Sequence, residues 1–73
     1  MDKRVVLKKR KDQAVRRFHP WVFSGAVDHL EGELQDGDLV AVYSKEEQVL
    51  GWGHYQDSKI TVRMLAFGAE APG

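Results

Sequence analysis

The absence of cysteine from a chain of only 73 residues is the feature that most limits how it can fold. Without cysteine, neither a disulfide framework nor a thiolate metal site can hold a small domain together. A domain of this size buries only about 60% of the surface that its unfolded chain exposes, so it depends on a well-packed apolar core. The hydrophobic fraction of 42% is that of a chain that folds. We therefore expect one small globular domain from a reducing compartment.

The N-terminus lacks the features of a targeting segment. Only three apolar residues, Val5 to Leu7, separate the charged residues Arg4 and Lys8. This run is too short for a signal peptide or a membrane span, so we expect a cytoplasmic protein with no membrane partner. An enzyme with a substrate cleft usually needs a larger scaffold, and the length therefore favours a binding or structural module.

The formal net charge of zero hides an uneven distribution along the chain. Residues 1–17 contain eight Lys or Arg and two Asp, a balance of +6, whereas residues 18–73 contain three Lys or Arg and nine Asp or Glu, a balance of −6. This asymmetry favours an anionic partner at the N-terminal end, with nucleic acid as the first candidate. A solubilising face, or pairing with the protein's own acidic loops, explains the same charges equally well.

The apolar pattern predicts a mainly β chain with one short helix, an α+β fold. Extended segments are expected at residues 5–7, 21–27, 39–43, 48–55 and 60–67. Short strands in a flat open sheet would leave their edges exposed. We therefore expect about five to six strands that close into a small pseudo-barrel.

A helix of about two turns is expected from Asp12, as its N-cap, to Phe18. Pro20 disfavours the helical conformation at His19, so the helix should end near Phe18. Because so short a helix is unstable alone, Val15 and Phe18 should both be anchored on a larger part of the fold.

Particular side chains are expected to build the core. Trp21 and Phe23 should anchor the second extended segment. Gly51 and Gly53 share one orientation in the return strand, a pattern that usually marks a bulge, a barrel bend or the close approach of another backbone. The last strand should turn three side chains inward, those of Ile60, Val62 and Met64.

The sequence contains no recognisable catalytic or metal-binding constellation. The spacing of His19, His29 and His54 matches no recurring zinc pattern. The pair Ser24-Gly25 lacks the preceding glycine of a nucleophile elbow, and Gly51-Trp52-Gly53 lacks the third glycine of a dinucleotide loop. We expect no catalytic residue, metal or cofactor in this chain.

A basic segment around the short helix is the candidate nucleic-acid site. Its cations could form a positive ridge against phosphates: Lys8, Lys9, Arg10, Lys11, Arg16 and Arg17. His19 and Trp21 are weaker candidates, because Trp21 could stack on an unpaired base but an aromatic residue in an apolar run is more often part of the core. Arg63 could extend the ridge, although a lone arginine among acidic neighbours more often forms an ion pair.

The most specific motif is the string Arg17-Phe18-His19-Pro20-Trp21-Val22-Phe23-Ser24-Gly25-Ala26. With this string, the chain resembles the N-terminal PUA domain of bacterial large-subunit ribosomal RNA methyltransferases that modify cytosine at C5. The resemblance continues to about Phe67 through Gly37-Asp38, Leu50-Gly51-x-Gly53 and Ser58-x-Ile60-x-x-Arg63.

The resemblance implies a PUA-like domain at residues 1–67, followed by a linker stub at residues 68–73. Such a domain would bind RNA and help to position structured ribosomal RNA. The site for S-adenosylmethionine and the catalytic cysteine would lie in a downstream methyltransferase domain that is absent here, so this chain would transfer no methyl group. Trp21, Phe23 and Gly25 in the motif either contact RNA or, as the preferred interpretation, fix the barrel.

A second interpretation comes from a different functional class. The barrel could be an interdomain or dimerisation module with little RNA affinity of its own, in which exposed Leu65 and Phe67 pack on the downstream domain or on a second copy. Such a module would tolerate charge reversal at Arg16 and Arg17 but would self-associate when isolated.

Overall fold

The computed structural model describes residues 3–68, which contain six strands, one α-helix and one 3-10 turn. The elements in chain order are β1 (Arg4–Leu7), α1 (Gln13–Arg16), β2 (Trp21–Phe23), the 3-10 turn (Ser24–Ala26), β3 (Val27–Glu31), β4 (Leu39–Tyr43), β5 (Val49–Tyr55) and β6 (Ile60–Phe67). The predicted mainly β class with a short helix is confirmed. Residues 69–73 of the predicted linker stub lie outside the described residues.

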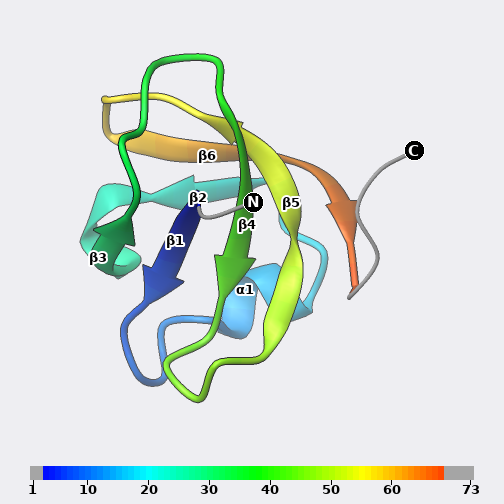
Figure 1. Ribbon diagram of the computed structural model, residues 1–73. Coiled ribbons are helices and arrows are strands. Elements are labelled where there is room, and N and C mark those ends of the chain that lie inside the picture. The colour runs from blue at the N-terminus through cyan, green and yellow to red at the C-terminus, as the bar shows by residue number, and fades with distance from the viewer. Residues whose placement is uncertain (1–2, 69–73) are drawn as a thin grey trace.

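All six strands belong to one curled sheet with the order β2-β6-β5-β4-β1-β3. Strands β1 and β4 are parallel, and every other neighbouring pair is antiparallel. Figure 1 shows that β2 and β6 cross behind β1, β4 and β5, while α1 lies at the lower end of the sheet. The curled sheet is the small pseudo-barrel that the sequence predicts.

The expectation of one continuous extended segment at residues 21–27 is wrong. Strand β2 ends at Phe23, the 3-10 turn redirects the chain, and β3 begins at Val27. Backbone hydrogen bonds hold this turn at both ends, because the Ser24 amide donates to the Lys59 carbonyl at 2.8 Å and the Lys8 amide donates to the Ala26 carbonyl at 2.8 Å. The two strands consequently occupy opposite edges of the sheet.

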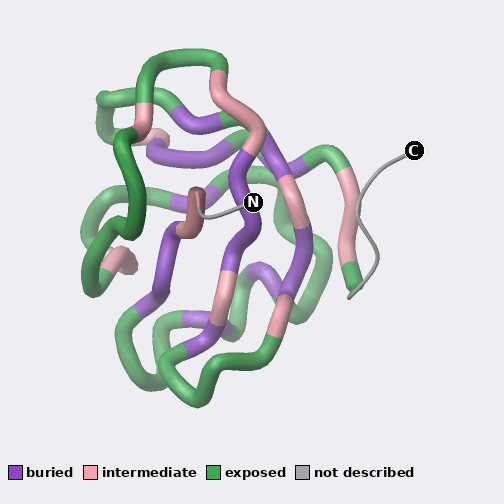
Figure 2. The backbone as a smooth tube through the Cα atoms, in the orientation of Figure 1, coloured by how far each residue is buried: buried purple, intermediate pink, exposed green. Residues whose placement is uncertain are grey.

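The core lies on the concave side of the curled sheet (Figure 2). Its buried side chains are those of Val5, Leu7, Val15, Val22, Val40, Val42, Leu50, Tyr55, Val62 and Met64. Val15 anchors α1 to the sheet as predicted. Val62 and Met64 of β6 point inward as predicted, whereas Ile60 is half-buried.

Of the three alternatives expected for Gly51 and Gly53, both the close approach of another backbone and a bulge are found. A Cβ atom on either glycine would clash with a backbone carbonyl oxygen of β6, and one on Gly53 would also lie 2.7 Å from Cγ1 of Val62. A β-bulge between Trp52 and Gly53 accompanies this contact. Side chains are therefore excluded from the two positions where β5 and β6 meet most closely.

Helix α1 begins as predicted, with Asp12 as its N-cap residue, but it ends earlier than predicted. The Asp12 side chain makes no capping hydrogen bond, and its carboxylate instead accepts a hydrogen bond from Nε of Arg16 at 2.6 Å. The helix ends at Arg16, two residues before the predicted end at Phe18. A single turn of helix thus replaces the expected two turns.

A Schellman-type C-cap ends the helix. The amide of Phe18 donates to the carbonyl of Val15, and the amide of His19 donates to the carbonyl of Ala14, both at 2.9 Å. Phe18 has a φ angle of 65°, in the left-handed region where glycine is usual. Its side chain is 71% exposed, so the expectation that Phe18 is anchored beside Val15 is wrong. Its ring instead meets Phe67 edge to face, with 5.2 Å between centroids.

We predict that Gly53→Ala lowers the free energy of unfolding by about 1–3 kcal/mol, the usual cost of overpacking. In a domain of this size each kcal/mol corresponds to a fall of about 4–8 °C in Tm, which thermal unfolding by circular dichroism would measure. Gly25→Ala is the matched control, because a Cβ atom there meets no atom within 4 Å. Equal Tm values for the two variants would contradict the close approach of β5 and β6.

Candidate nucleic-acid interface

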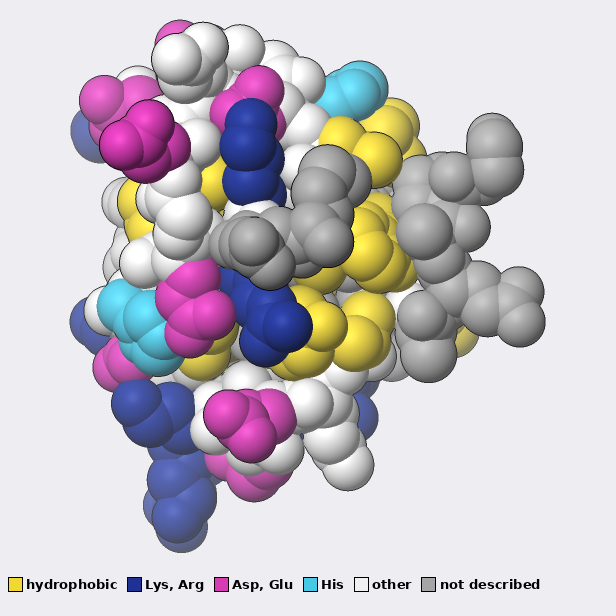
Figure 3. Space-filling model, in the orientation of Figure 1, with side chains coloured by type: hydrophobic (Ala, Val, Ile, Leu, Met, Phe, Trp, Pro, Cys, Tyr) yellow, Lys and Arg dark blue, Asp and Glu magenta, His cyan; other side chains and the backbone are white. Residues whose placement is uncertain are grey.

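The four consecutive cations Lys8, Lys9, Arg10 and Lys11 form the turn between β1 and α1, here called the basic turn. All four residues are exposed, and the Lys11 amide closes the turn by donating to the Lys8 carbonyl at 3.0 Å. Figure 3 shows a group of Lys and Arg side chains that projects at the lower left, where Figure 1 places this turn. The basic turn is therefore a compact cationic projection.

The basic turn differs in its surroundings from three other cations of the described residues. Lys3, Arg16 and Lys45 each form an ion pair with an aspartate. Within residues 3–68, no side chain of the basic turn forms an ion pair, and neither does Arg17 at the C-cap of α1. Pairing with the protein's own acidic loops therefore does not account for these five charges in the described part of the chain.

Within residues 3–68, Arg16 is the one predicted ridge residue whose side chain forms hydrogen bonds with the rest of the protein. Its Nε donates to Asp12 at 2.6 Å, and its Nη2 donates to Oε1 of Gln48 at 2.7 Å. These bonds tie α1 to the end of the β4–β5 loop. Because two partners already hold the guanidinium, Arg16 is less available to a ligand than Arg17.

The placement of Trp21 and Phe23 in the core is wrong. Trp21 is 42% exposed and Phe23 is 48% exposed, while Val22 between them is 2% exposed. Side chains alternate between the two faces of a strand, so either Val22 or the pair Trp21 and Phe23 can face the core, but not both. Val22 faces inward, and the two aromatic residues therefore lie on the outer face of β2.

His19 lies beside these exposed aromatic residues. Its Nδ1 accepts a hydrogen bond from the Trp21 amide at 3.2 Å. The ring centroids of His19 lie 6.3 Å from Trp21 and 6.2 Å from Phe23, and those of Trp21 and Phe23 lie 6.3 Å apart. The three rings, here called the aromatic row, form one exposed cluster at the edge strand β2, with His19 just before the strand and Trp21 and Phe23 within it.

Arg63 faces the aromatic row from the neighbouring strand. It pairs with Trp21 in the β2–β6 register, and its Cζ lies 5.9 Å from the centroid of the Trp21 ring. No carboxylate within residues 3–68 forms an ion pair with it, so the expected ion pair is not found there. Phe23 was not among the predicted site residues, although strict alternation around Val22 would have placed it beside Trp21.

The predicted site residues thus divide into two groups. The basic turn and Arg17 flank α1, whereas His19 and Trp21 lie beyond the helix at the start of β2. Within residues 3–68, no side-chain hydrogen bond or ring contact joins the basic turn to the aromatic row. The interface therefore has a cationic part and an aromatic part.

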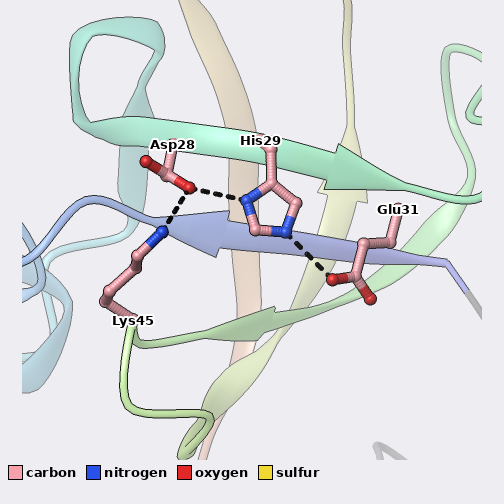
Figure 4. A network of polar contacts seen from close by, with 4 residues as sticks. All are labelled: Asp28, His29, Glu31 and Lys45. Atoms are coloured by element: carbon pink, nitrogen blue, oxygen red, sulfur yellow. Dashed lines mark hydrogen bonds and ion pairs between the residues drawn. The ribbon is translucent and has the colours of Figure 1, made fainter.

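A separate polar network joins β3 to the β4–β5 loop (Figure 4). Asp28 lies 2.8 Å from Nζ of Lys45 and 2.6 Å from Nδ1 of His29, whose Nε2 lies 2.9 Å from Glu31. Hydrogen bonds from Lys45 and then from His29 lower the pKa of Asp28. Hydrogen bonds to Asp28 and then to Glu31 raise the pKa of His29 above its ordinary value of 6.5.

We predict that Asp28→Asn lowers the pKa of His29, because the substitution removes the larger of its two stabilising contacts. The raised pKa of His29 adds stability that is complete below its unfolded value and is lost as the pH rises through the folded value. Asp28 adds stability that is lost as the pH falls through its lowered pKa. The pKa of His29 is measured from the pH dependence of its ring proton shifts by NMR. The control is Glu33→Gln, on the exposed β3–β4 loop, and an unchanged pKa in Asp28→Asn would contradict the network.

The described residues contain no group of three or more His, Cys, Asp or Glu side chains that could hold a metal ion. Within the same part of the chain, no helix has the length and apolar character needed to cross a membrane.

Residues 5–67 match the family described as the PUA-like domain, and the chain belongs to this family. It is 46% identical over 68 residues to the ribosomal RNA large subunit methyltransferase I of Alteromonas mediterranea, and 40% identical over 68 residues to that of Pseudoalteromonas atlantica. Each match covers 92% of this chain and 17% of the relative. The chain therefore spans about one sixth of the length of these methyltransferases. These matches confirm the family resemblance.

A solved structure shares the fold. It is the structure of an H/ACA RNP bound to a substrate RNA containing 2'-deoxyuridine, and one of its chains matches with a TM-score of 0.72 at 21% sequence identity. The match covers 90% of this chain and 23% of that chain. The likeness supports the PUA-like architecture.

Proposed function

We propose that this chain is an RNA-binding PUA-like domain that helps to position structured ribosomal RNA for a methyltransferase domain of a longer protein. The observation that carries this proposal is the basic turn, whose four exposed cations have no carboxylate partner within residues 3–68. The named activity of the relatives, methylation of large-subunit ribosomal RNA, supports RNA as the anionic partner.

Phosphate contacts explain how so small a domain would bind RNA. Lysine and arginine side chains that meet phosphates release condensed counterions, which makes affinity high at low salt and independent of sequence. The basic turn and Arg17 would supply these contacts, with Arg16 in a supporting role because Asp12 and Gln48 hold it. Sequence choice would then come from RNA shape and from the catalytic domain.

The catalytic chemistry is proposed to lie outside this chain. The relatives are methyltransferases of which this chain spans 17%. A downstream domain would bind S-adenosylmethionine and carry out the transfer, on cytosine C5 if the family resemblance extends to the target atom. We assign residues 1–67 to the RNA-binding domain and residues 68–73 to a linker, and we place the protein in the cytoplasm, where bacterial ribosomal RNA is found.

A packing role is the second candidate. Leu65 on the outer face of β6 is 54% exposed, which fits a contact with a downstream domain or a second copy. Phe67 is half-buried and already meets Phe18, so it offers less free surface. If packing were the only role, Arg16→Glu combined with Arg17→Glu would leave RNA affinity unchanged, and the isolated chain would self-associate.

We predict that the affinity of this chain for a ribosomal RNA hairpin falls with salt at a log-log slope near −3. Four or five phosphate contacts at about −0.7 each give this value. Lys9→Glu should weaken binding roughly fivefold, or about 1 kcal/mol, and reduce the slope by about 0.7. Fluorescence anisotropy at several salt concentrations measures both quantities.

Lys59→Glu is the matched control, because it reverses one exposed lysine in the β5–β6 loop, at the opposite end of the sheet from the basic turn (Figure 1). Its effect should be clearly smaller than that of Lys9→Glu. A wild-type slope near zero, or equal losses in the two variants, would refute the assignment of phosphate binding to the basic turn.

A further inference from the structure

We infer that Trp21, Phe23 and Arg63 form a stacking site for unpaired bases of the bound RNA, separate from the phosphate-binding basic turn. The inference rests on the proposed function and adds the kind of RNA that the domain recognises: a segment with bases that are not stacked in a helix. It also adds Phe23 and Arg63 to the interface.

The first argument is the exposure of the aromatic row. Trp21 and Phe23 are 42% and 48% exposed, although each has a large apolar ring that water solvates poorly. Val22 is the residue of β2 that packs into the core, and it is 2% exposed. The two rings therefore add little to core packing, and their exposed faces are available to a planar ligand.

The second argument is the shape of the surface. The three rings of the aromatic row touch one another, with centroids 6.2 to 6.3 Å apart, and the short strand β2 holds Trp21 and Phe23 two residues apart on one face. Strand β2 is an edge strand that pairs only with β6 in the described sheet. A flexible strand of nucleic acid can reach such an edge without displacing any part of the fold.

The third argument is the cation that accompanies the rings. The guanidinium of Arg63 lies 5.9 Å from the centroid of Trp21, within the range of cation–π attraction. A base held between two planar groups needs them about 7 Å apart, twice the usual carbon contact distance. Because Arg63 and Trp21 are both exposed, a shift of about 1 Å would admit a base between them.

The chemistry of the surface suits the stacking of RNA bases. The surface contains two aromatic rings, an imidazole and a guanidinium, all of which stack on bases. Protein interfaces are also rich in Trp, Phe and Arg, so the test below includes a protein contact as one of its outcomes. Leu65 is the one large aliphatic side chain exposed on β6 in the described part of the chain. Within residues 3–68, no carboxylate forms an ion pair with Arg63, so its charge is available to the phosphates that link successive bases.

The test compares two ligands of equal charge, a 12-nucleotide oligouridine and an abasic ribose-phosphate strand of the same length. Oligouridine has little internal stacking, so its bases are free to meet the protein. Stacking on an aromatic side chain contributes about 1–3 kcal/mol per base, so the 73-residue chain should bind oligouridine roughly tenfold more tightly than the abasic strand. The affinities are measured by NMR titration up to near-millimolar ligand.

Variants assign the difference to individual side chains. Trp21→Ala should remove the roughly tenfold preference for oligouridine while leaving the affinity for the abasic strand unchanged, and Trp21→Phe should retain most of the preference. Leu30→Ala, on the opposite edge strand β3, is the control because Leu30 is also 42% exposed. The indole N–H signal of Trp52 is an internal reference, since that group is buried.

The possible outcomes are distinct. A preference for oligouridine that depends on Trp21 supports the stacking site. Equal binding of both strands, unaffected by Trp21→Ala, would overturn the stacking site and leave phosphate binding by the basic turn intact. Absence of binding to either strand would overturn both proposals, and self-association that Trp21→Ala abolishes would assign the aromatic row to a protein contact instead.

Discussion

The close approach of β5 and β6 at Gly51 and Gly53 is the constraint on which the rest of the fold depends. With no Cβ atom at either position, β6 can lie against β5 through a bulge and curl across the back of the sheet. The curled β6 then pairs with β2 on its far side. The core thus closes without cysteine, and the outer face of β2 becomes part of the surface.

This arrangement explains how one short stretch of chain can present two kinds of ligand-binding chemistry. Residues 8–23 run from the basic turn through one turn of helix to β2, with Val15 and Val22 as the buried anchors. Around these anchors, the cations of the basic turn and the rings of the aromatic row remain exposed. The proposed division of labour follows from that alternation: phosphates at the turn and unpaired bases at the strand.

Much of the fold could be predicted from periodicity and from special residues. Alternating apolar positions identified β4, β5 and β6, and the paired glycines identified the close approach. Strand β3 was missed because most of its side chains are polar and exposed, and it joins the fold through backbone pairing with β1 and through Val27, which packs against the core. No apolar pattern can reveal such a strand.

The site was only partly predictable for a related reason. Charge clustering predicts the basic turn directly. A run of three apolar residues does not reveal which of them faces inward, and the expectation that Trp21 and Phe23 anchor the core is wrong. The fold selects Val22 because it pairs with buried Val62 in the β2–β6 register, whereas Trp21 pairs with exposed Arg63. The left-handed conformation of Phe18 was likewise unpredictable, since that position of a C-cap usually holds glycine.

The most direct test of the account is an NMR titration of the isotope-labelled chain with a structured ribosomal RNA hairpin that has a single-stranded loop, at low and moderate salt. The account predicts amide shifts clustered at residues 8–11, at Arg17 and along β2, with the shifts at the basic turn fading as salt is added. The absence of amide shifts at near-millimolar RNA, or shifts confined to the region of Leu65 and Phe67, would contradict the account.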